Sequence, residues 1–384
     1  MLTRTSLRAA GGLLAVGALA LTMSACSSKS NASGGGSGSK ASAATSAADL
    51  GGMDALVAAA KKEGALNVIA LPPDWANYGG LISGFKAKYP GITVNSANPD
   101  GSSADEVNAI KSLKGQTRAP DVVDVGQSFA ISGVADGLYA PYKVATWSAI
   151  PDTLKASDGS WVNDYGGYIS IGCDGAKVAS CPTTLAALNN PAYKGKVALN
   201  GDPLKANAAF SAVWAASLAK GGSLDDIQPG IDFFGQLAKA GIYKPVQASA
   251  ATIESGETPI VLDWDYLNAA KTTDVNGKGG KWTVAVPSDA QFPAYYAQAI
   301  SKYAPHPAAA RLWEEYLYSV EGQNGWLKGG ARPAEMTAMT SAATIDKTLA
   351  AALPAVSGTP TFPSDAQTTK AKTTLTAKWA AAVG

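Results

Sequence analysis

Strand-like and helix-like segments alternate along most of this chain, and the alternation limits the folds that it can adopt. Residues 54–63 are helix formers that stop at a glycine, 66–71 form a short apolar run, and 81–89 keep helical spacing. Strand-like runs follow at 92–95 and 122–126. This β-α-β-α-β order predicts an α/β fold, with a parallel sheet covered by helices.

The second half of the chain repeats the pattern. Further strands are predicted at 196–200, 259–263 and 282–286, and further helices around 210–218, 227–238 and 309–317. The segment 336–384 is rich in Ala and Thr and predicts a helical extension at the C-terminus. A length of 384 residues predicts two domains.

Composition excludes several functional classes. The chain has 31 Lys and Arg against 30 Asp and Glu, whereas nucleic-acid binding needs a basic face. A single histidine, His306, excludes multi-histidine metal sites, and three cysteines cannot form the usual four-ligand zinc cluster. We therefore expect no nucleic-acid partner and no resident metal. We also expect no cofactor and no catalytic residues.

The N-terminus carries an export signal. Arg4 and Arg8 precede an apolar stretch at 9–21, which is too short to span a bilayer comfortably. Small residues then lead to Cys26 and resemble the lipobox of bacterial lipoproteins, in which the cysteine takes a diacylglyceryl group. The resemblance implies that 1–26 is a signal peptide and that Cys26 anchors the protein at the outer face of the cytoplasmic membrane. An ordinary secretory signal with a chance cysteine is the alternative.

The segment 27–49 is rich in Ser, Gly and Ala and predicts a flexible tether. No later segment has 18 uncharged apolar residues, so we expect the body to be soluble. With Cys26 acylated, Cys173 and Cys181 remain, and two cysteines in an exported protein predict a local disulfide.

Five segments, in the expected order, resemble the periplasmic-type solute-binding proteins of bacterial ABC importers. The relevant branch binds polyamines, ferric iron, thiamine or aminophosphonates, and the chain is most like the spermidine/putrescine-binding proteins. The resembling segments are 58–64 (AAAKKEG), 85–92 (FKAKYPGI), 119–123 (APDVV), 183–198 (from TTL to KGKVA) and 304–323 (from APHPAA to VEGQ).

The resemblance implies a two-lobed periplasmic-binding-protein-like fold of type II, with hinge strands and a ligand cleft between the lobes. Lobe 1 would comprise 50–165 and 283–335, and lobe 2 would comprise 166–282. Closure buries the ligand, and the closed form docks on membrane permease subunits. We also expect a monomer.

In open α/β sheets, ligands bind beyond the carboxyl ends of the strands. Asp74, Trp75 and Tyr78 follow the first strand, and aromatic side chains there suit an organic ligand. The alternative is that the aromatic residues cap the next helix. Asp124 and Gln127 follow the third strand, where a ligand site and a simple turn are both compatible with the sequence.

In the second half, Asp202 and Asn207 lie between a strand and a helix, where Asp202 is more typical of a cap than of a ligand contact. The segment 263–266 is the most informative. If the chain stays extended there, two acids share one face and two aromatic residues share the other, which suits an ammonium ligand. Helix caps and core aromatics are the alternative. These candidates are Asp263, Trp264, Asp265 and Tyr266.

A tyrosine pair, Tyr295 and Tyr296, raises the alternative of ferric iron, but adjacent residues on a strand face opposite ways. Tyr295 is retained as a ligand-site candidate. An exported hydrolase is a more distant alternative, since the chain lacks a G-x-S-x-G motif. The sequence therefore predicts a lipid-anchored binding protein that delivers a small cationic, polyamine-like solute to a permease.

Overall fold

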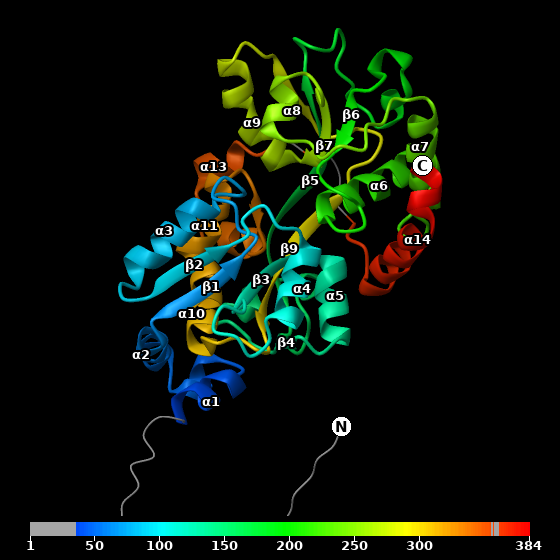
Figure 1. Cartoon of the computed structure of the whole chain (residues 1–384). Coiled ribbons are helices and arrows are strands. Elements are labelled where there is room, and N and C mark those ends of the chain that lie inside the picture. The colour runs from blue at the N-terminus through cyan, green and yellow to red at the C-terminus, as the bar shows by residue number, and fades with distance from the viewer. Residues whose placement is uncertain (1–35, 355, 357–360) are drawn as a thin grey trace, which may run out of the picture. The chain divides into compact units, whose positions relative to one another are not determined.

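The computed structural model describes residues 36–354, 356 and 361–384, so the predicted signal peptide and Cys26 lie outside the described residues. Helices alternate with strands through most of this region (Figure 1). The α-helices are α1 (Gly36–Ala43), α2 (Met53–Glu63), α3 (Tyr78–Lys88), α4 (Ser103–Ser112), α5 (Gln127–Ala135), α6 (Asn207–Ala219), α7 (Gln228–Lys239), α8 (Ala250–Glu254), α9 (Asp265–Gly277), α10 (Pro307–Leu317), α11 (Val320–Lys328), α12 (Met336–Ser341), α13 (Lys347–Ala351) and α14 (Asp365–Val383). Short 3-10 helices lie at Ala47–Leu50, Trp147–Ala149, Asp152–Leu154, Ala186–Asn189 and Pro191–Tyr193.

The strands form a two-stranded parallel sheet, β1–β2, and a mixed sheet in the order β3-β9-β5-β7-β6. Three shorter strands extend the mixed sheet: β4 pairs with β9, while β8 and β10 pair with β5. Their bounds are β1 (Ala65–Ile69), β2 (Thr93–Ala97), β3 (Val122–Gly126), β4 (Tyr139–Ala140), β5 (Val162–Asp174), β6 (Val197–Leu199), β7 (Ile260–Trp264), β8 (Trp282–Ala285), β9 (Pro293–Ser301) and β10 (Arg332–Pro333).

Strand β5 is shared by two lobes. Its first half pairs with β9, and its second half pairs with β7 and β8. We call the part built from β1–β4, α2–α5, α10 and α11 lobe 1, and the part built from α6–α9 and β6–β8 lobe 2 (Figure 1). All 13 residues of β5 are buried, as a strand covered on both faces must be.

Most predicted elements of lobe 1 are present, with one topological difference. Helix α2 ends at Gly64, whose φ of 74° is the left-handed conformation that glycine adopts readily. β1 and β2 are parallel, as predicted, but β3 pairs antiparallel with β9. The prediction of a purely parallel sheet is therefore wrong, because β9 returns from far along the chain and pairs with β3.

The N-terminal part of the described chain is folded, so the predicted tether does not extend over residues 36–49. Helix α1 lies in this segment, and Ala41 and Ala44 are buried. The guanidinium of Arg311, on α10, donates hydrogen bonds to the backbone oxygens of Ala44 (2.8 Å) and Ser42 (3.0 Å). The sequence prediction failed here because small residues can pack closely once a distant arginine satisfies their carbonyls.

Lobe 2 has the predicted strands and helices, and the predicted disulfide joins Cys173 to Cys181. Cys173 lies at the end of β5, so the bridge closes a local loop. Strand β8 pairs with Ile171–Asp174 of β5, on the lobe 2 side. The chain therefore returns to lobe 1 after β8 and later than residue 283.

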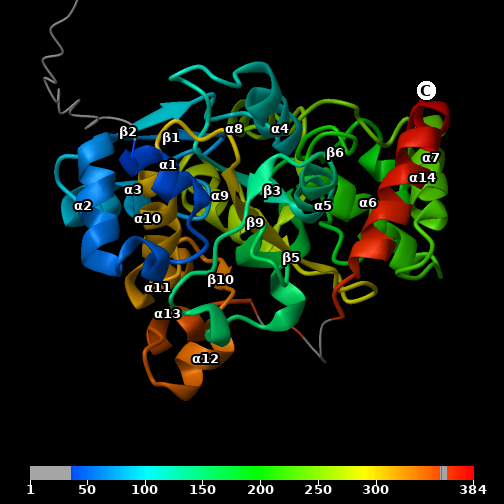
Figure 2. The ribbon, with the colours of Figure 1, turned by 90° about the horizontal axis from the view of Figure 1, so that it is seen from below.

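The C-terminal segment is helical, as predicted, and its last helix, α14, lies beside α7 (Figures 1 and 2). Among the residues that the structure describes, no helix combines the length and apolar character that crossing a bilayer requires. The same residues contain no cluster of three or more His, Cys, Asp or Glu side chains suited to a metal ion.

Candidate functional site

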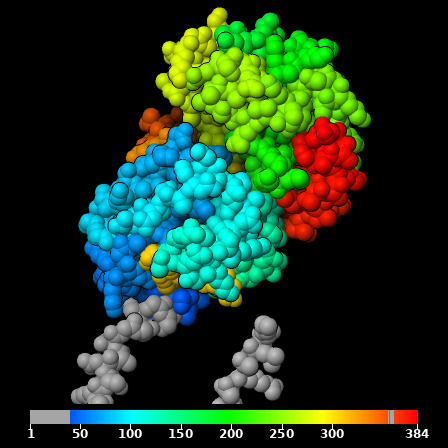
Figure 3. Space-filling view, viewed as in Figure 1, coloured from blue at the N-terminus to red at the C-terminus, as the bar shows by residue number. Residues whose placement is uncertain are grey.

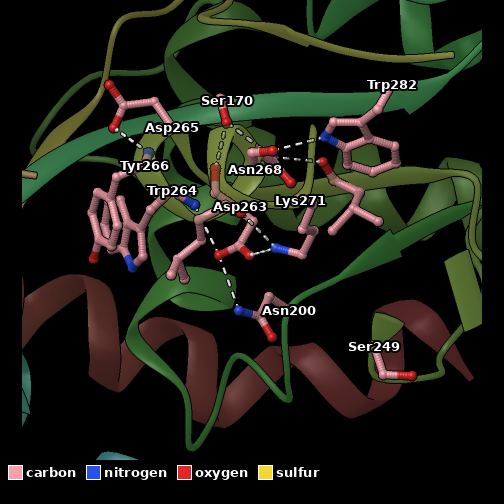
Figure 4. A network of polar contacts seen from close by, with 12 residues as sticks. Ser170, Asn200, Ser249, Asp263, Trp264, Asp265, Tyr266, Asn268, Lys271 and Trp282 are labelled. Carbon is pink, nitrogen blue, oxygen red and sulfur yellow. Dashed lines mark hydrogen bonds and ion pairs between the residues drawn. The ribbon is translucent and has the colours of Figure 1, made fainter. Parts of the chain in front are cut away.

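The segment 263–266 does not stay extended. Strand β7 ends at Trp264, and α9 begins at Asp265. Figure 4 shows that the side chains of Asp263 and Asp265 point in different directions. The predicted shared acidic face is therefore wrong, because the turn into the helix breaks the two-residue alternation of a strand.

Each of these two acids already has a cation. The carboxylate of Asp263 is 3.0 Å from Lys271 Nζ and accepts hydrogen bonds from Asn200 Nδ2 (3.0 Å) and the Trp264 amide (2.8 Å) (Figure 4). Asp265 Oδ2 lies 2.6 Å from Arg332 Nη1. Burial raises the pKa of Asp265, while the guanidinium lowers it. Both acids thus fix the end of β7 and the start of α9.

Five aromatic side chains meet where the two lobes touch, and we call them the aromatic box. They come from the β1–α3 loop, β5, β7, α9 and β9: Trp75, Tyr165, Trp264, Tyr266 and Tyr296. The Tyr165 and Tyr296 rings are stacked with centroids 5.6 Å apart, and Trp75 lies edge-on to Tyr296 at 5.6 Å. Trp75 also reaches across to Tyr266 at 6.5 Å, so the box contains side chains of both lobes.

A β-bulge places Tyr165 in the box. The pairing of β5 with β9 shifts register between Asn163 and Gly166, so two residues of β5 lie opposite one residue of β9. Tyr165 therefore faces the same side as Tyr296. A side chain on Gly166 would overlap with Tyr295, which explains the glycine beside the bulge.

Asp124 is the carboxylate of the box. Its Oδ2 accepts a hydrogen bond from the Tyr165 hydroxyl (2.8 Å), which in turn accepts one from Trp75 Nε1 (2.7 Å). Asp124 lies near the carboxyl end of β3 and is 6% exposed. Burial raises the pKa of Asp124 to about 7, against the lowering effect of hydrogen bonds from Tyr78 and Tyr165.

Two further buried acids lie close to Asp124. Glu106 accepts a hydrogen bond from the Asp124 amide (2.8 Å), and Asp164 is in the bulge itself. Burial, followed by the negative charge of Asp124, raises the pKa values of both carboxyls well above the usual range. No ion pair within residues 36–354, 356 and 361–384 involves any of these three acids.

The box also contains an unused polar group. The Tyr266 hydroxyl is buried and has no hydrogen-bond partner among the residues that the structure describes. Buried polar groups are nearly always paired, so this hydroxyl could form a hydrogen bond with a bound molecule. The site thus offers aromatic faces, buried carboxyl groups and a hydroxyl without a partner among the described residues.

The remaining predicted residues have other surroundings. Asp74 is exposed, and Asp202 closes a turn by accepting a hydrogen bond from the Leu204 amide (2.9 Å). Tyr78 is buried behind the box, edge-on to Tyr165 at 6.0 Å, and its hydroxyl accepts a hydrogen bond from Gln298 Nε2.

Gln127, Asn207 and Tyr295 line a separate cavity of about 50 Å³ between α6, β9 and the segment before α14. A Cβ on Gly126 would overlap with the Asn207 side chain, so the end of β3 packs tightly against the start of α6. Tyr295 faces this cavity and Tyr296 faces the box. The two tyrosines therefore do not converge on one point, which argues against a shared iron ion.

Sequence reasoning missed Glu106, Asp164 and Tyr165. Tyr165 precedes Gly166 and Gly167, and paired glycines in a strand-like run are a signal for a bulge or a close approach. The burial of Glu106 had no comparable signal, because it follows Ser102 in a segment typical of an exposed helix start.

Solved structures confirm the fold. AfuA from Actinobacillus pleuropneumoniae, a periplasmic binding protein with fructose-6-phosphate bound, matches with a TM-score of 0.66 and 17% identity over 83% of this chain and 98% of that chain. Iron-bound HitA from Pseudomonas aeruginosa matches with a TM-score of 0.57 and 18% identity over 81% and 97% of the two chains. A protein from Listeria monocytogenes described as a spermidine/putrescine ABC transporter matches with a TM-score of 0.57 and 14% identity over 75% and 88%.

A search of curated proteins returns no significant match. A sequence profile described as "bacterial extracellular solute-binding protein" matches residues 118–352, which is more than half of the chain. The two-lobed fold agrees with that match. This chain belongs to the family of bacterial extracellular solute-binding proteins.

Proposed function

We propose that this protein is the substrate-binding component of an ABC import system and that its ligand is a small cationic, polyamine-like solute. The ligand would occupy the aromatic box between the lobes and be delivered to a membrane permease. The observation that carries the proposal is the contrast in pairing: Asp263 and Asp265 have internal cations, whereas Asp124 has none among the described residues.

The chemistry of the box suits an ammonium group. A buried carboxylate without a cation is unfavourable, so a ligand that supplies positive charge is stabilised where a neutral one is not. The faces of Trp75, Tyr266 and Tyr296 attract the same charge through cation–π contact. The Tyr266 hydroxyl can form one further hydrogen bond.

Binding would be coupled to closure. Trp75 belongs to lobe 1 and Tyr266 to lobe 2, so a ligand contacts both only when the lobes are together. A ligand that binds the closed form more tightly shifts the population toward it. The permease would then recognise the closed form, as the family resemblance implies.

The interactions are strong enough for a useful affinity. Hydrogen bonds to charged groups contribute about 1.5–3 kcal/mol each. An aromatic face adds about 0.5–2 kcal/mol. Once the ordering costs of association are subtracted, we expect a small diamine to bind with micromolar affinity, which is a binding free energy of about −8.2 kcal/mol.

Calorimetry tests the ligand class. We expect putrescine or spermidine to bind, and thiamine, 2-aminoethylphosphonate, fructose 6-phosphate and ferric citrate to bind more weakly or not at all. The aromatic box and Asp124 contain no basic side chain that could pair with a phosphate, so phosphate-bearing ligands are disfavoured. Tight binding of only a phosphate ester or ferric iron would disprove the polyamine assignment while leaving the binding-protein assignment intact.

We also propose that Cys26 carries a lipid anchor and that the protein is a monomer. The motivation is the lipobox-like segment before Cys26. Replacement of Cys26 by Ala should release the protein from membranes or leave an unprocessed precursor, which fractionation and mass spectrometry detect. Normal membrane retention of the processed Cys26→Ala variant would exclude the thioether anchor. Light scattering of the detergent-free soluble form tests the monomer.

A further inference from the structure

The C-terminal helix α14 is anchored on lobe 2. A capping box formed by Ser364 and Gln367 begins the helix, and Leu375 and Trp379 are buried. The Trp379 ring lies 5.7 Å from that of Phe234, on α7, and 6.1 Å from that of Tyr243. Figures 1 and 2 show α14 alongside α7 in two orthogonal views.

The same helix also contacts lobe 1. Asp365 Oδ1, at the start of α14, accepts a hydrogen bond from Gln127 Nε2 on α5 (3.2 Å). Lys372 Nζ lies 4.8 Å from the ring of Phe129, which is on α5, and 5.3 Å from the ring of Phe210, which is on α6. Figure 3 shows α14, in red, on the surface between the green lobe 2 and the blue-green part of lobe 1.

Lys372 is held from both sides. Its ammonium donates hydrogen bonds to the backbone oxygens of Leu204 (2.7 Å) and Pro203 (3.3 Å), in lobe 2, while its charge faces Phe129 of lobe 1. Burial lowers the pKa of Lys372 to about 8, which agrees with an ammonium enclosed between the lobes. Separation of the lobes would remove the contact with Phe129 and expose the lysine.

Hydrogen bonds connect the start of α14 with the aromatic box. Gln127 donates to Asp365 and accepts from Asn163 Nδ2 (3.3 Å). Asn163 Nδ2 also donates to the backbone oxygen of Tyr296 (2.8 Å), a box residue on the hinge strand β9. The start of α14 is therefore linked to the aromatic box through a chain of hydrogen bonds.

We infer that α14 is an interlobe strap, which remains attached to lobe 2 and holds lobe 1 in the closed arrangement through Asp365 and Lys372. Opening of the lobes breaks the contacts to Gln127 and Phe129 while the contacts to α7 remain. The strap therefore sets how easily the lobes open without ligand, and on the proposed function it tunes ligand affinity and release.

The test measures opening without ligand, so it does not depend on the ligand's identity. Spin labels at Lys61→Cys and Asp274→Cys, exposed sites in the two lobes, report the interlobe distance by double electron–electron resonance. Cys26→Ser is included throughout so that only the introduced cysteines react. We expect a predominantly short, closed distance for the otherwise unmodified protein.

The lobe 1 contacts are then removed by combining Asp365→Ala with Phe129→Leu. We expect at least half of the molecules to move to a longer distance, with α14 still docked. The matched control is Lys378→Ala, which removes the hydrogen bond of α14 to Gln228 of lobe 2 and leaves the start of the helix intact. The control should keep the short distance.

Circular dichroism verifies that each variant is folded, and Lys372→Met provides a second test that leaves both aromatic partners in place. Longer distances for the lobe 1 pair and for Lys372→Met, but not for the control, support the strap. Unchanged distances in both would overturn it, whatever the outcome of the ligand titrations. If the distances change as expected but no amine binds, the result would contradict only the proposed function.

Discussion

Asp124, in lobe 1, and Asp265, in lobe 2, are both buried carboxylates near the carboxyl end of a strand, but they differ in whether the protein supplies a cationic partner. Asp265 has Arg332 at 2.6 Å and receives amide hydrogen bonds, so its charge is satisfied inside the protein. Asp124 accepts a hydrogen bond from the Tyr165 hydroxyl and has no ion pair within the described chain. The ion pair of Asp265 therefore stabilises the fold, whereas Asp124 has no internal cation, and we propose that it faces a ligand.

Replacement of Asp265, the acid with an internal ion pair, should have the largest effect on the free energy of unfolding. Asp265→Asn leaves Arg332 buried without its partner, which typically costs about 3–5 kcal/mol. We expect a fall of that size in the free energy of unfolding, measured with urea in the absence of ligand. Asp274→Asn, an exposed site on the same helix, is the control. A fall below about 1 kcal/mol would remove the distinction between the two acids.

Loss of the unpaired acid should affect binding more than stability. Asp124→Asn removes the charge that faces the box, and we expect amine affinity to fall about 100-fold, or about 2.7 kcal/mol. Unfolding free energy at pH 8 should stay the same or rise, because a buried charge is lost. Calorimetry and urea titration measure the two effects. Asp136→Asn, an exposed acid of lobe 1, should change neither.

The pH dependence of stability tests the burial of Asp124. The folded-state pKa of Asp124 is raised to about 7, so between about pH 4 and 7 the folded protein binds more protons than the unfolded chain. Unfolding free energy without ligand should therefore fall as pH rises through this window, by about 1 kcal/mol per pH unit.

Urea titrations of the unliganded protein from pH 5 to 8 measure this slope. Asp124→Asn should reduce the slope without abolishing it, because other buried carboxyls whose pKa values are also raised contribute with the same sign; they include Glu106, Asp164, Asp265, Glu314 and Glu335. Amine affinity should change in the opposite direction and weaken below pH 7, because a cation must displace the proton. An affinity that does not change with pH would contradict the role of Asp124.

The smallest expected effect concerns the aromatic side of the box. Trp75→Leu removes one face and the hydrogen bond to Tyr165, and we expect amine affinity to fall about 3- to 30-fold, or about 0.5–2 kcal/mol. Trp147→Leu, outside the box, is the control. Equal effects of the two substitutions in calorimetry would show that Trp75 acts through stability alone.

The same comparison shows what could be predicted from sequence. Local patterns predicted most strands and helices, and the spacing of Cys173 and Cys181 predicted their disulfide. These predictions succeed because they depend on neighbours in sequence. The rule that ligands lie beyond strand ends pointed to Trp75 and Asp124, and their role as ligand contacts stays a prediction.

Long-range partners could not be predicted. The acids at 263 and 265 looked like a ligand site because nothing local shows that Lys271 and Arg332 neutralise them. The antiparallel pairing of β3 with β9 and the anchoring of residues 42 and 44 by Arg311 likewise join distant segments. Whether a buried acid has a cationic partner inside the protein depends on the tertiary structure.

The bulge in β5 makes the geometry of the aromatic box sensitive to chain length as well as to residue type. Two residues of β5 face one residue of β9 there, and a register change of one residue turns every side chain to the other face. Deletion of Asp164 would remove the bulge and restore a regular ladder. Tyr165 would then stay on the face of the aromatic box only if the part of β5 in lobe 2 moved by one residue along the strand. A homologue lacking this one residue should therefore keep the fold while its hinge presents a different wall to the ligand.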